Sequence, residues 1–168
     1  MRLTAFTDYT IRTLIYLALR PGRLVTISDI SEAYGISNNH LMKVVHQLAV
    51  SGDVATVRGQ RGGLRLGRAA AEINLGAVVR RVEPDLRIAP CFGHVETCTI
   101  QADCVLEKAL QEALTAFLSV LDRYTLADLA ARPTALAALL GIQLTEIRPP
   151  DAPAAGSAAL AARGIAPG

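Results

Sequence analysis

The sequence contains no tryptophan, few aromatic residues and no apolar run as long as the roughly 18 residues that a transmembrane helix requires. We therefore expect no membrane span. The first residues, MRLTAFTDYTIRTLIYLAL, lack the charged start, continuous apolar stretch and small-residue cleavage site of a signal peptide. Together these absences predict a cytoplasmic protein.

Familiar catalytic patterns are also missing. The sequence has no phosphate-binding glycine loop between a strand and a helix, no HExxH pair and no pattern of a catalytic triad. The glycines of Arg61-Gly62-Gly63 fall in a predicted hairpin instead. These absences argue against an enzyme or an electron carrier, and we expect no catalytic residues.

Cysteine is scarce, but its three occurrences lie close together at Cys91, Cys98 and Cys104. Cytoplasmic thiols stay reduced, and an odd number of them argues against a disulfide framework. The segment around them has no regular apolar period. Thiolates gathered in one loop are typical of a metal centre or of redox chemistry.

Positive charge is concentrated in the N-terminal half. Residues 1–90 carry 12 Lys and Arg against 7 Asp and Glu, a balance of +5, whereas residues 91–168 carry 5 against 8, or −3. This asymmetry favours the N-terminal half as the binding surface for a polyanion.

The N-terminal half carries the signals of a helix-turn-helix. Apolar residues at helical spacing predict a first helix over residues 8–20. Thr26 and Asp29 form the pattern of a capping box, which begins a short second helix. Gly35 ends that helix, because glycine readily adopts the left-handed conformation found after a helix.

The third predicted helix, over about residues 38–51, has two distinct faces and is capped by Ser37. Its apolar stripe is Leu41, Val44, Val45 and Leu48. Residues 53–67, DVATVRGQRGGLRLG, resemble two strands around a basic, glycine-rich tip, which predicts a β-hairpin wing. We therefore predict a mainly α fold with a small β-hairpin, a winged helix-turn-helix followed by a long dimerisation helix.

The third helix and the wing together predict double-stranded DNA as a partner. An α-helix fits the major groove, and wing arginines can reach the minor groove or the phosphates. The predicted contact residues are Ser37, Asn38, Asn39, His40, Lys43, Arg58, Gln60 and Arg61. In a two-fold dimer the recognition helices lie about 34 Å apart, so the operator should be an inverted repeat.

The C-terminal half is dominated by one amphipathic helix. A short helix over residues 75–83 precedes the cysteines, and a strong helical period begins near Val105. Its apolar residues are Leu106, Ala109, Leu110, Ala113, Leu114, Phe117, Leu118 and Leu121. Such a stripe needs an opposite surface, so we expect a homodimer. Thr125 and Asp128 predict a last short helix, and the Pro- and Ala-rich end predicts a disordered tail.

The gaps between the cysteines, of six and five residues, are longer than the two to four that structural zinc sites favour. Longer gaps and soft thiolates favour an iron–sulfur cluster. Three cysteines leave the cluster one ligand short. The candidates for the fourth ligand are His94, Glu96, Asp103 and Glu107 nearby, and Asp8 from elsewhere in the fold.

Several segments resemble the Rrf family of winged-helix iron–sulfur transcriptional regulators. They are MRLTAFTDYTIRTLIYLA, YGISNNHLMKVVHQL, VRGQRGGLRLG and the three cysteines, and the likeness runs from Met1 to about Leu144. FTDY, with Asp8, and LDRYTLADL resemble the nitric-oxide-sensing branch of the family. Glu107 stands where the branch that controls cluster biogenesis has a histidine ligand. The Cys-Phe start and the YGIS turn are similar to the iron-responsive branch.

The resemblance implies a homodimeric repressor that binds a [4Fe–4S] or [2Fe–2S] cluster through Cys91, Cys98 and Cys104. It also implies that Asp8 of the partner subunit is the fourth ligand, and that nitric oxide attacks the cluster and weakens operator binding. An iron-status regulator and a clusterless thiol switch are the alternatives.

The expected organisation has four parts. Residues 1–83 form the DNA-binding domain, 84–104 the cluster-binding loop, 105–144 the dimerisation helix with the short helix after it, and 145–168 the tail.

Overall fold

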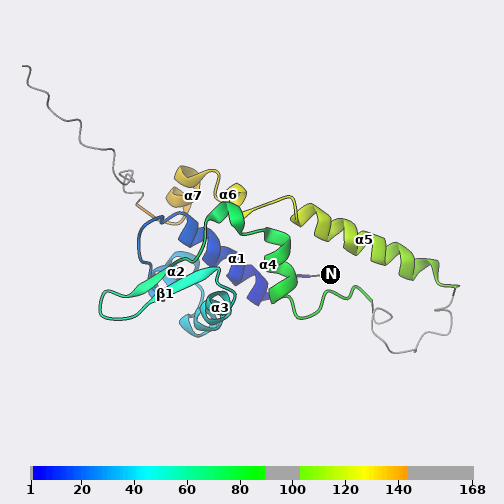
Figure 1. Cartoon of the computed structure of the whole chain (residues 1–168), viewed down its shortest axis with the longest axis horizontal. Coiled ribbons are helices and arrows are strands. Elements are labelled where there is room, and N and C mark those ends of the chain that lie inside the picture. Colours follow the sequence, from blue (N-terminus) through cyan, green and yellow to red (C-terminus); the bar gives the residue numbers. More distant parts are fainter. Residues whose placement is uncertain (1, 90–102, 144–168) are drawn as a thin grey trace, which may run out of the picture.

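The computed structural model describes residues 2–89 and 103–143, whose arrangement is drawn in Figure 1. Cys91, Cys98 and the predicted tail lie outside the described residues. The described chain is mainly α-helical with a two-stranded antiparallel hairpin, which confirms the predicted fold class. In chain order the elements are α1 (Ala5–Ala18), α2 (Ile27–Tyr34), α3 (Asn38–Val50), β1 (Val54–Val57), β2 (Gly63–Leu66), η1 (Ala70–Glu72), α4 (Leu75–Val82), α5 (Val105–Leu121), α6 (Leu126–Leu129) and α7 (Pro133–Leu139).

Helix α1 begins at Ala5, earlier than the predicted start at residue 8. The Thr4 hydroxyl accepts a hydrogen bond from the backbone N–H of Thr7 and so caps the helix. Helix α1 lies in the middle of the fold, where it packs against α3, α4 and α6. The side chains of Leu14 and Leu17 are almost fully buried there.

The helix-turn-helix has the predicted caps. Thr26 and Asp29 form a reciprocal capping box at the start of α2, and Gly35 ends that helix with φ of 65°. Ser37 caps α3, whose predicted apolar stripe is buried in full. Local hydrogen bonding thus defines where α2 begins and ends and where α3 begins, and the buried stripe determines which face of α3 is exposed.

The hairpin is the predicted wing. Its register pairs Val54 with Leu66 and Val57 with Gly63. Val25, between α1 and α2, pairs with Leu64 through two backbone hydrogen bonds of 2.9 and 2.7 Å. This short bridge attaches the wing to the helix-turn-helix, so the two parts share one core.

The end of the chain differs from its prediction. One short helix was expected after α5, and that count was wrong because α6 and α7 are both present. Pro133 occupies the first turn of α7, a position that suits its fixed φ and its missing N–H. Ala137 and Ile142 are buried in the same core as the helix-turn-helix.

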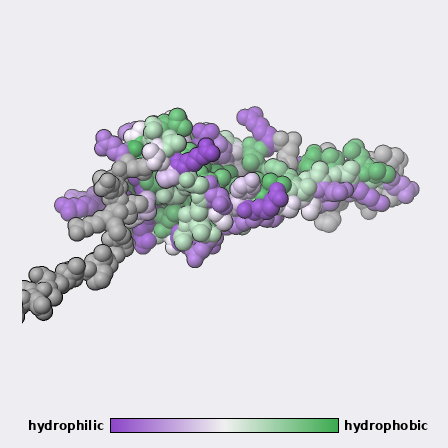
Figure 2. All heavy atoms as spheres, turned by 90° about the horizontal axis from the view of Figure 1, so that it is seen from above, coloured by the Kyte–Doolittle hydropathy of each residue, from purple (hydrophilic) through white to green (hydrophobic). Residues whose placement is uncertain are grey.

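Helix α5 extends away from this body, as Figure 1 shows, and none of its residues is buried in the described chain. Figure 2 shows hydrophobic residues gathered along it. Among the described helices, none combines the length and the apolar character that crossing a bilayer requires.

Candidate nucleic-acid interface and metal centre

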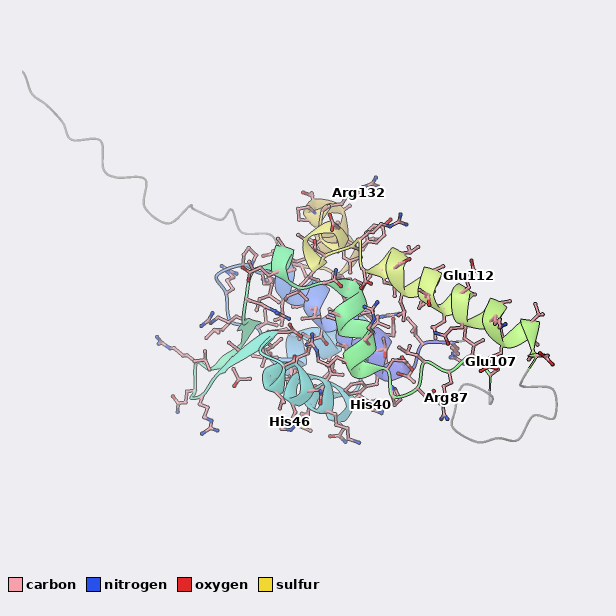
Figure 3. All side chains as sticks on the ribbon, turned by 45° about the vertical axis from the view of Figure 1, so that its right-hand side comes forward. His40, His46, Arg87, Glu107, Glu112 and Arg132 are labelled. Atoms are coloured by element: carbon pink, nitrogen blue, oxygen red, sulfur yellow. The ribbon has the colours of Figure 1, made fainter. Side chains whose placement is uncertain are left out.

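The outer face of α3 consists of exposed side chains that project away from the core. Its members are Asn38, Asn39, His40, Met42, Lys43 and His46, and all of them are exposed. Figure 3 shows His40 and His46 on the side of α3 that faces away from the rest of the molecule. Amide, imidazole and ammonium groups on such a face match the donors and acceptors of base edges in a major groove.

The start of α3 is held by contacts on both sides of His40. The Ser37 hydroxyl lies 2.9 Å from Nδ1 of His40 and also accepts from its backbone N–H. The ring of Tyr9, on α1, lies 5.8 Å from the imidazole ring between centroids. These contacts orient the first turn of α3, the turn that enters the groove in a helix-turn-helix.

The predicted wing residues Arg58, Gln60 and Arg61 lie in the connection between β1 and β2, and all three are exposed. Exposed guanidinium groups at the tip of a hairpin can contact phosphates or enter a minor groove. All eight residues predicted to contact DNA are therefore on the surface, on two elements of one core.

Sequence reasoning missed Met42, an apolar residue with 51% of its surface exposed on the outer face of α3. It lies one turn after Asn38 and one turn before His46, and this spacing in the sequence already indicates that Met42 shares their face of the helix. The residues predicted for that face are all polar. An exposed apolar group suits the C5-methyl of thymine, the apolar group of the major groove.

Asp53 lies between α3 and β1, and its side chain is fully buried. Ser51 donates to its Oδ2 at 2.8 Å, and Arg68 and Arg81 both pair with the carboxylate. Burial by itself raises the pKa of Asp53, but the hydrogen bonds from Ser51, Arg68 and Arg81 outweigh it and lower the pKa below its ordinary value. Asp53 is thus an anion in the folded protein.

The end of α4 is joined to the start of α1. The buried carboxylate of Glu83 accepts hydrogen bonds from the backbone N–H of Thr4, at 3.1 Å, and from the Thr7 hydroxyl. Glu83 is the first residue after α4 and precedes the segment that carries the cysteines. The start of that segment is therefore fixed close to the first turn of α1, where Asp8 lies.

Of the predicted metal ligands, Asp8 and Cys104 lie in the described part of the chain. Asp8 is half-exposed in the first turn of α1 and pairs with Arg12 at 2.9 Å. Cys104 is the half-buried N-cap residue of α5, and its side chain makes no capping hydrogen bond. Within residues 2–89 and 103–143, no three His, Cys, Asp or Glu side chains form a group that could hold a metal ion. Cys91 and Cys98 lie outside those ranges, so the predicted ligand set stays a prediction.

The chemistry of the two described donors fits the predicted cluster. Cys104 lies at the N-terminus of α5, and cysteine is a soft sulfur ligand of the kind that iron–sulfur clusters use. A half-exposed carboxylate on a rigid helix is available to a partner subunit. The other fourth-ligand candidates in the described chain are Asp103, which is exposed, and Glu107, which is half-buried on α5 (Figure 3).

The sequence pattern of the Rrf2 family, described as an iron-dependent transcriptional regulator, matches residues 3–132. The chain belongs to the Rrf2 family. Its winged helix-turn-helix and long α5 are thus the fold of a family of regulators, which agrees with the prediction that the chain is not an enzyme.

Relatives within the Rrf2 family are similar over most of the chain. The HTH-type transcriptional regulator NsrR of Bacillus subtilis (strain 168) is 51% identical over 131 residues, which cover 77% of this chain and 90% of the relative. NsrR of Halalkalibacterium halodurans is 45% identical over 145 residues, covering 85% and 99%. The chain is a transcriptional regulator similar to these proteins.

Solved structures give the same fold. CymR, the global cysteine regulator of B. subtilis, superposes with a TM-score of 0.62 at 26% identity, covering 78% of this chain and 97% of that one. IscR of T. potens superposes with a TM-score of 0.63 at 25% identity, covering 78% and 87%.

Proposed function

We propose that the chain is a homodimeric repressor that binds an inverted-repeat operator and senses nitric oxide through an iron–sulfur cluster. One observation carries the DNA-binding part. All eight predicted contact residues are exposed, on a helix and a hairpin whose opposite faces are buried in one core. The resemblance of the FTDY segment to the nitric-oxide-sensing branch, together with the identity to NsrR, supports the choice of signal.

The exposed surface of α5 supports the homodimer. Val105 is 77% exposed and Leu106 is 65% exposed in the single chain. The helix has 17 residues and is about 25 Å long, so its apolar stripe is too extended to leave in water. A second copy of α5 would cover it, and the two-fold axis would set the spacing of the two α3 helices.

The proposed cluster would be held by Cys91, Cys98 and Cys104 of one subunit and by Asp8 of the partner subunit. When bound, it supplies iron with which nitric oxide reacts. Asp8 is a hard oxygen ligand among soft thiolates, which makes it the weakest bond of the set. Arg12 lies one turn away on α1 and already pairs with Asp8, so a released Asp8 has a charged partner.

The decisive experiment is an anaerobic purification, followed by absorption spectra and operator binding during titration with nitric oxide. The proposal expects a coloured protein whose cluster band is replaced by iron–nitrosyl absorption at low equivalents, with a parallel loss of operator binding. A colourless protein whose DNA binding responds to peroxide would establish a thiol switch instead.

An iron-responsive regulator is the second candidate, because the family description names iron dependence. It predicts a cluster that is indifferent to nitric oxide, and operator binding that is lost when a chelator removes the iron. The same titration separates the two candidates.

A further inference from the structure

Asp53 joins the recognition helix to the wing, and its carboxylate is out of contact with water. Three donors from different segments meet there. Ser51 is the C-cap residue of α3, Arg68 follows β2, and Arg81 belongs to α4. The backbone carbonyl of Asp53 also accepts a hydrogen bond of 2.8 Å from Gly67. Ser51 and Arg68 hold Asp53 to the DNA-reading elements, whereas Arg81 holds it to α4.

Arg80, the neighbour of Arg81 on α4, pairs with the C-terminal end of α5. Its two guanidinium nitrogens donate to the two carboxylate oxygens of Asp122, each at 2.6 Å. Asp122 is the C-cap residue of α5. Asn74, the N-cap of α4, donates to the Asp122 carbonyl at 2.7 Å. A Cβ at Gly76 would lie 2.0 Å from Asp122 Oδ1, so only glycine permits this close approach.

Two consecutive arginines therefore connect one short helix to both functional halves. We propose that α4 is the link between α5 and the DNA-reading elements, with Arg80–Asp122 at one end and Arg81–Asp53 at the other. In this link Asp53 and Arg81 are positioning residues for α3 and the wing. The inference rests on the proposed function, because the cysteine segment whose state would be transmitted runs from α4 to α5.

The physical reason that the link transmits movement is the burial of Asp53. A surface ion pair such as Arg80–Asp122 can separate into water at little cost, so the α5 end of the link is also held through backbone carbonyls. Asn74 donates to the Asp122 carbonyl at 2.7 Å, and the N–H of Leu75 donates to the Tyr124 carbonyl at 2.9 Å. If Arg81 moved away, the buried carboxylate of Asp53 would keep Ser51 and Arg68 but lose one of its two charged partners, which is unfavourable. When α4 moves, Asp53 must follow Arg81, and α3 and β1 on either side of Asp53 move with it. Helix α4 has eight residues, which makes it a rigid rod about 12 Å long.

The matched control is Arg68, because it pairs with the same carboxylate but lies within the DNA-reading half. We suggest Arg81→Gln and Arg68→Gln in the full chain, purified anaerobically, with circular dichroism as a check of folding. The probe is a duplex that the wild-type protein selects from a randomised pool. Its dissociation constant is measured before and after treatment with stoichiometric nitric oxide.

We expect the ratio of the two dissociation constants to be about tenfold or more in the wild type. Arg81→Gln should reduce it to below about threefold, whereas Arg68→Gln should leave it at the wild-type value. Equal ratios in Arg81→Gln and the wild type, or equal changes in both variants, would overturn the link. If Arg81→Gln does not fold, Arg81→Lys replaces it, since it keeps the charge but lacks the planar guanidinium that pairs with Asp53.

A second measurement does not depend on the signal. Operator affinity is compared for Arg80→Gln, Arg81→Gln and the double variant without nitric oxide. If the two pairs act in series, the double variant should be no weaker than the more affected single variant. If the losses of operator affinity in the two single variants add up in the double variant, the link is contradicted. This outcome does not depend on whether the protein responds to nitric oxide. A wild type that selects no duplex would refute the DNA-binding proposal itself and, with it, the link.

Discussion

Asp8 and Arg12 form an ion pair of 2.9 Å, one turn apart on α1, and each side chain is close to half-exposed. Arg12 also lies over the ring of Tyr34, the last residue of α2, at 5.7 Å from its centroid. Asp8 is thus connected through Arg12 to the helix-turn-helix, and its carboxylate remains accessible to a second subunit.

Replacement of Asp8 by Ala should change the metal site and leave operator binding present. The expected result is an altered absorption spectrum and an altered number of nitric oxide equivalents, because one oxygen ligand is gone. Glu32→Ala is the control, since Glu32 is an exposed carboxylate on the neighbouring α2. A spectrum and a sensitivity identical to those of the wild type would remove Asp8 from the ligand set.

Lys43→Ala and Arg61→Ala should each weaken binding to every duplex by a similar factor. Each variant should also reduce the slope of log affinity against log salt concentration by about 1, because one phosphate contact is lost. Arg132 is the control, as Figure 3 shows it on the opposite side of the molecule from His40 and His46. Arg132→Ala should leave the slope unchanged, and an unchanged slope in Lys43→Ala would contradict a phosphate contact by that side chain.

Met42 should contact a thymine methyl group in the operator. Replacement of the contacted thymine by deoxyuridine removes one methyl group and should weaken wild-type binding about fourfold, since one methyl group is worth about 0.8 kcal/mol. The Met42→Ala variant should show no such loss at that position. Binding is measured with thymines replaced one at a time, and a variant that responds to every replacement as the wild type does would exclude the contact.

Local signals account for what the sequence predicted well. The Thr26–Asp29 capping box, the Ser37 cap and the stripe of α3 involve residues within one or two turns, so their spacing in the sequence is their spacing in space. The contacts of Asp53 are different. Its partners Arg68 and Arg81 are 15 and 28 residues away, and each is one of many arginines in the N-terminal half.

Sequence patterns could not predict these ion pairs of Asp53, because an aspartate just before a strand is typical of a turn. Only the packing of α4 against α1 and α5 brings Arg81 to Asp53. The metal site has a related difficulty. Its predicted ligands come from the start of α1 and from the cysteine segment, and the spacing of cysteines alone does not identify the fourth ligand.

The stability of the protein should depend on Asp53 and on pH in a defined way. The pKa of Asp53 in the folded protein lies below its ordinary value of 3.8. Its contribution is therefore fully present above that pH and is lost as the pH falls through the folded pKa. Asp53→Asn should lower the free energy of unfolding near neutral pH by about 2 kcal/mol, less than for a wholly buried pair, because both arginines are partly exposed.

That difference between Asp53→Asn and the wild type should shrink at acid pH. Urea unfolding of the cluster-free protein, measured between neutral pH and about pH 3, tests this. Asp29→Asn is the control, because Asp29 is an exposed carboxylate in the capping box of α2. A difference that stays constant down to the lowest pH would mean that folding does not shift the pKa of Asp53.

The apolar surface of α5 should hold the dimer together. Leu106→Glu introduces a charge where the side chain is 65% exposed in the single chain and, in the proposed dimer, covered by the partner. We expect a shift from dimer to monomer in sedimentation velocity, because a charge in an apolar interface is desolvated without a partner. Operator affinity should fall with it, since each monomer contacts only one half-site. Thr115→Glu places the same charge at an exposed polar position of α5 and should remain dimeric. If Leu106→Glu sediments as a dimer, the start of α5 is not in the interface, and the two recognition helices must be spaced by another surface.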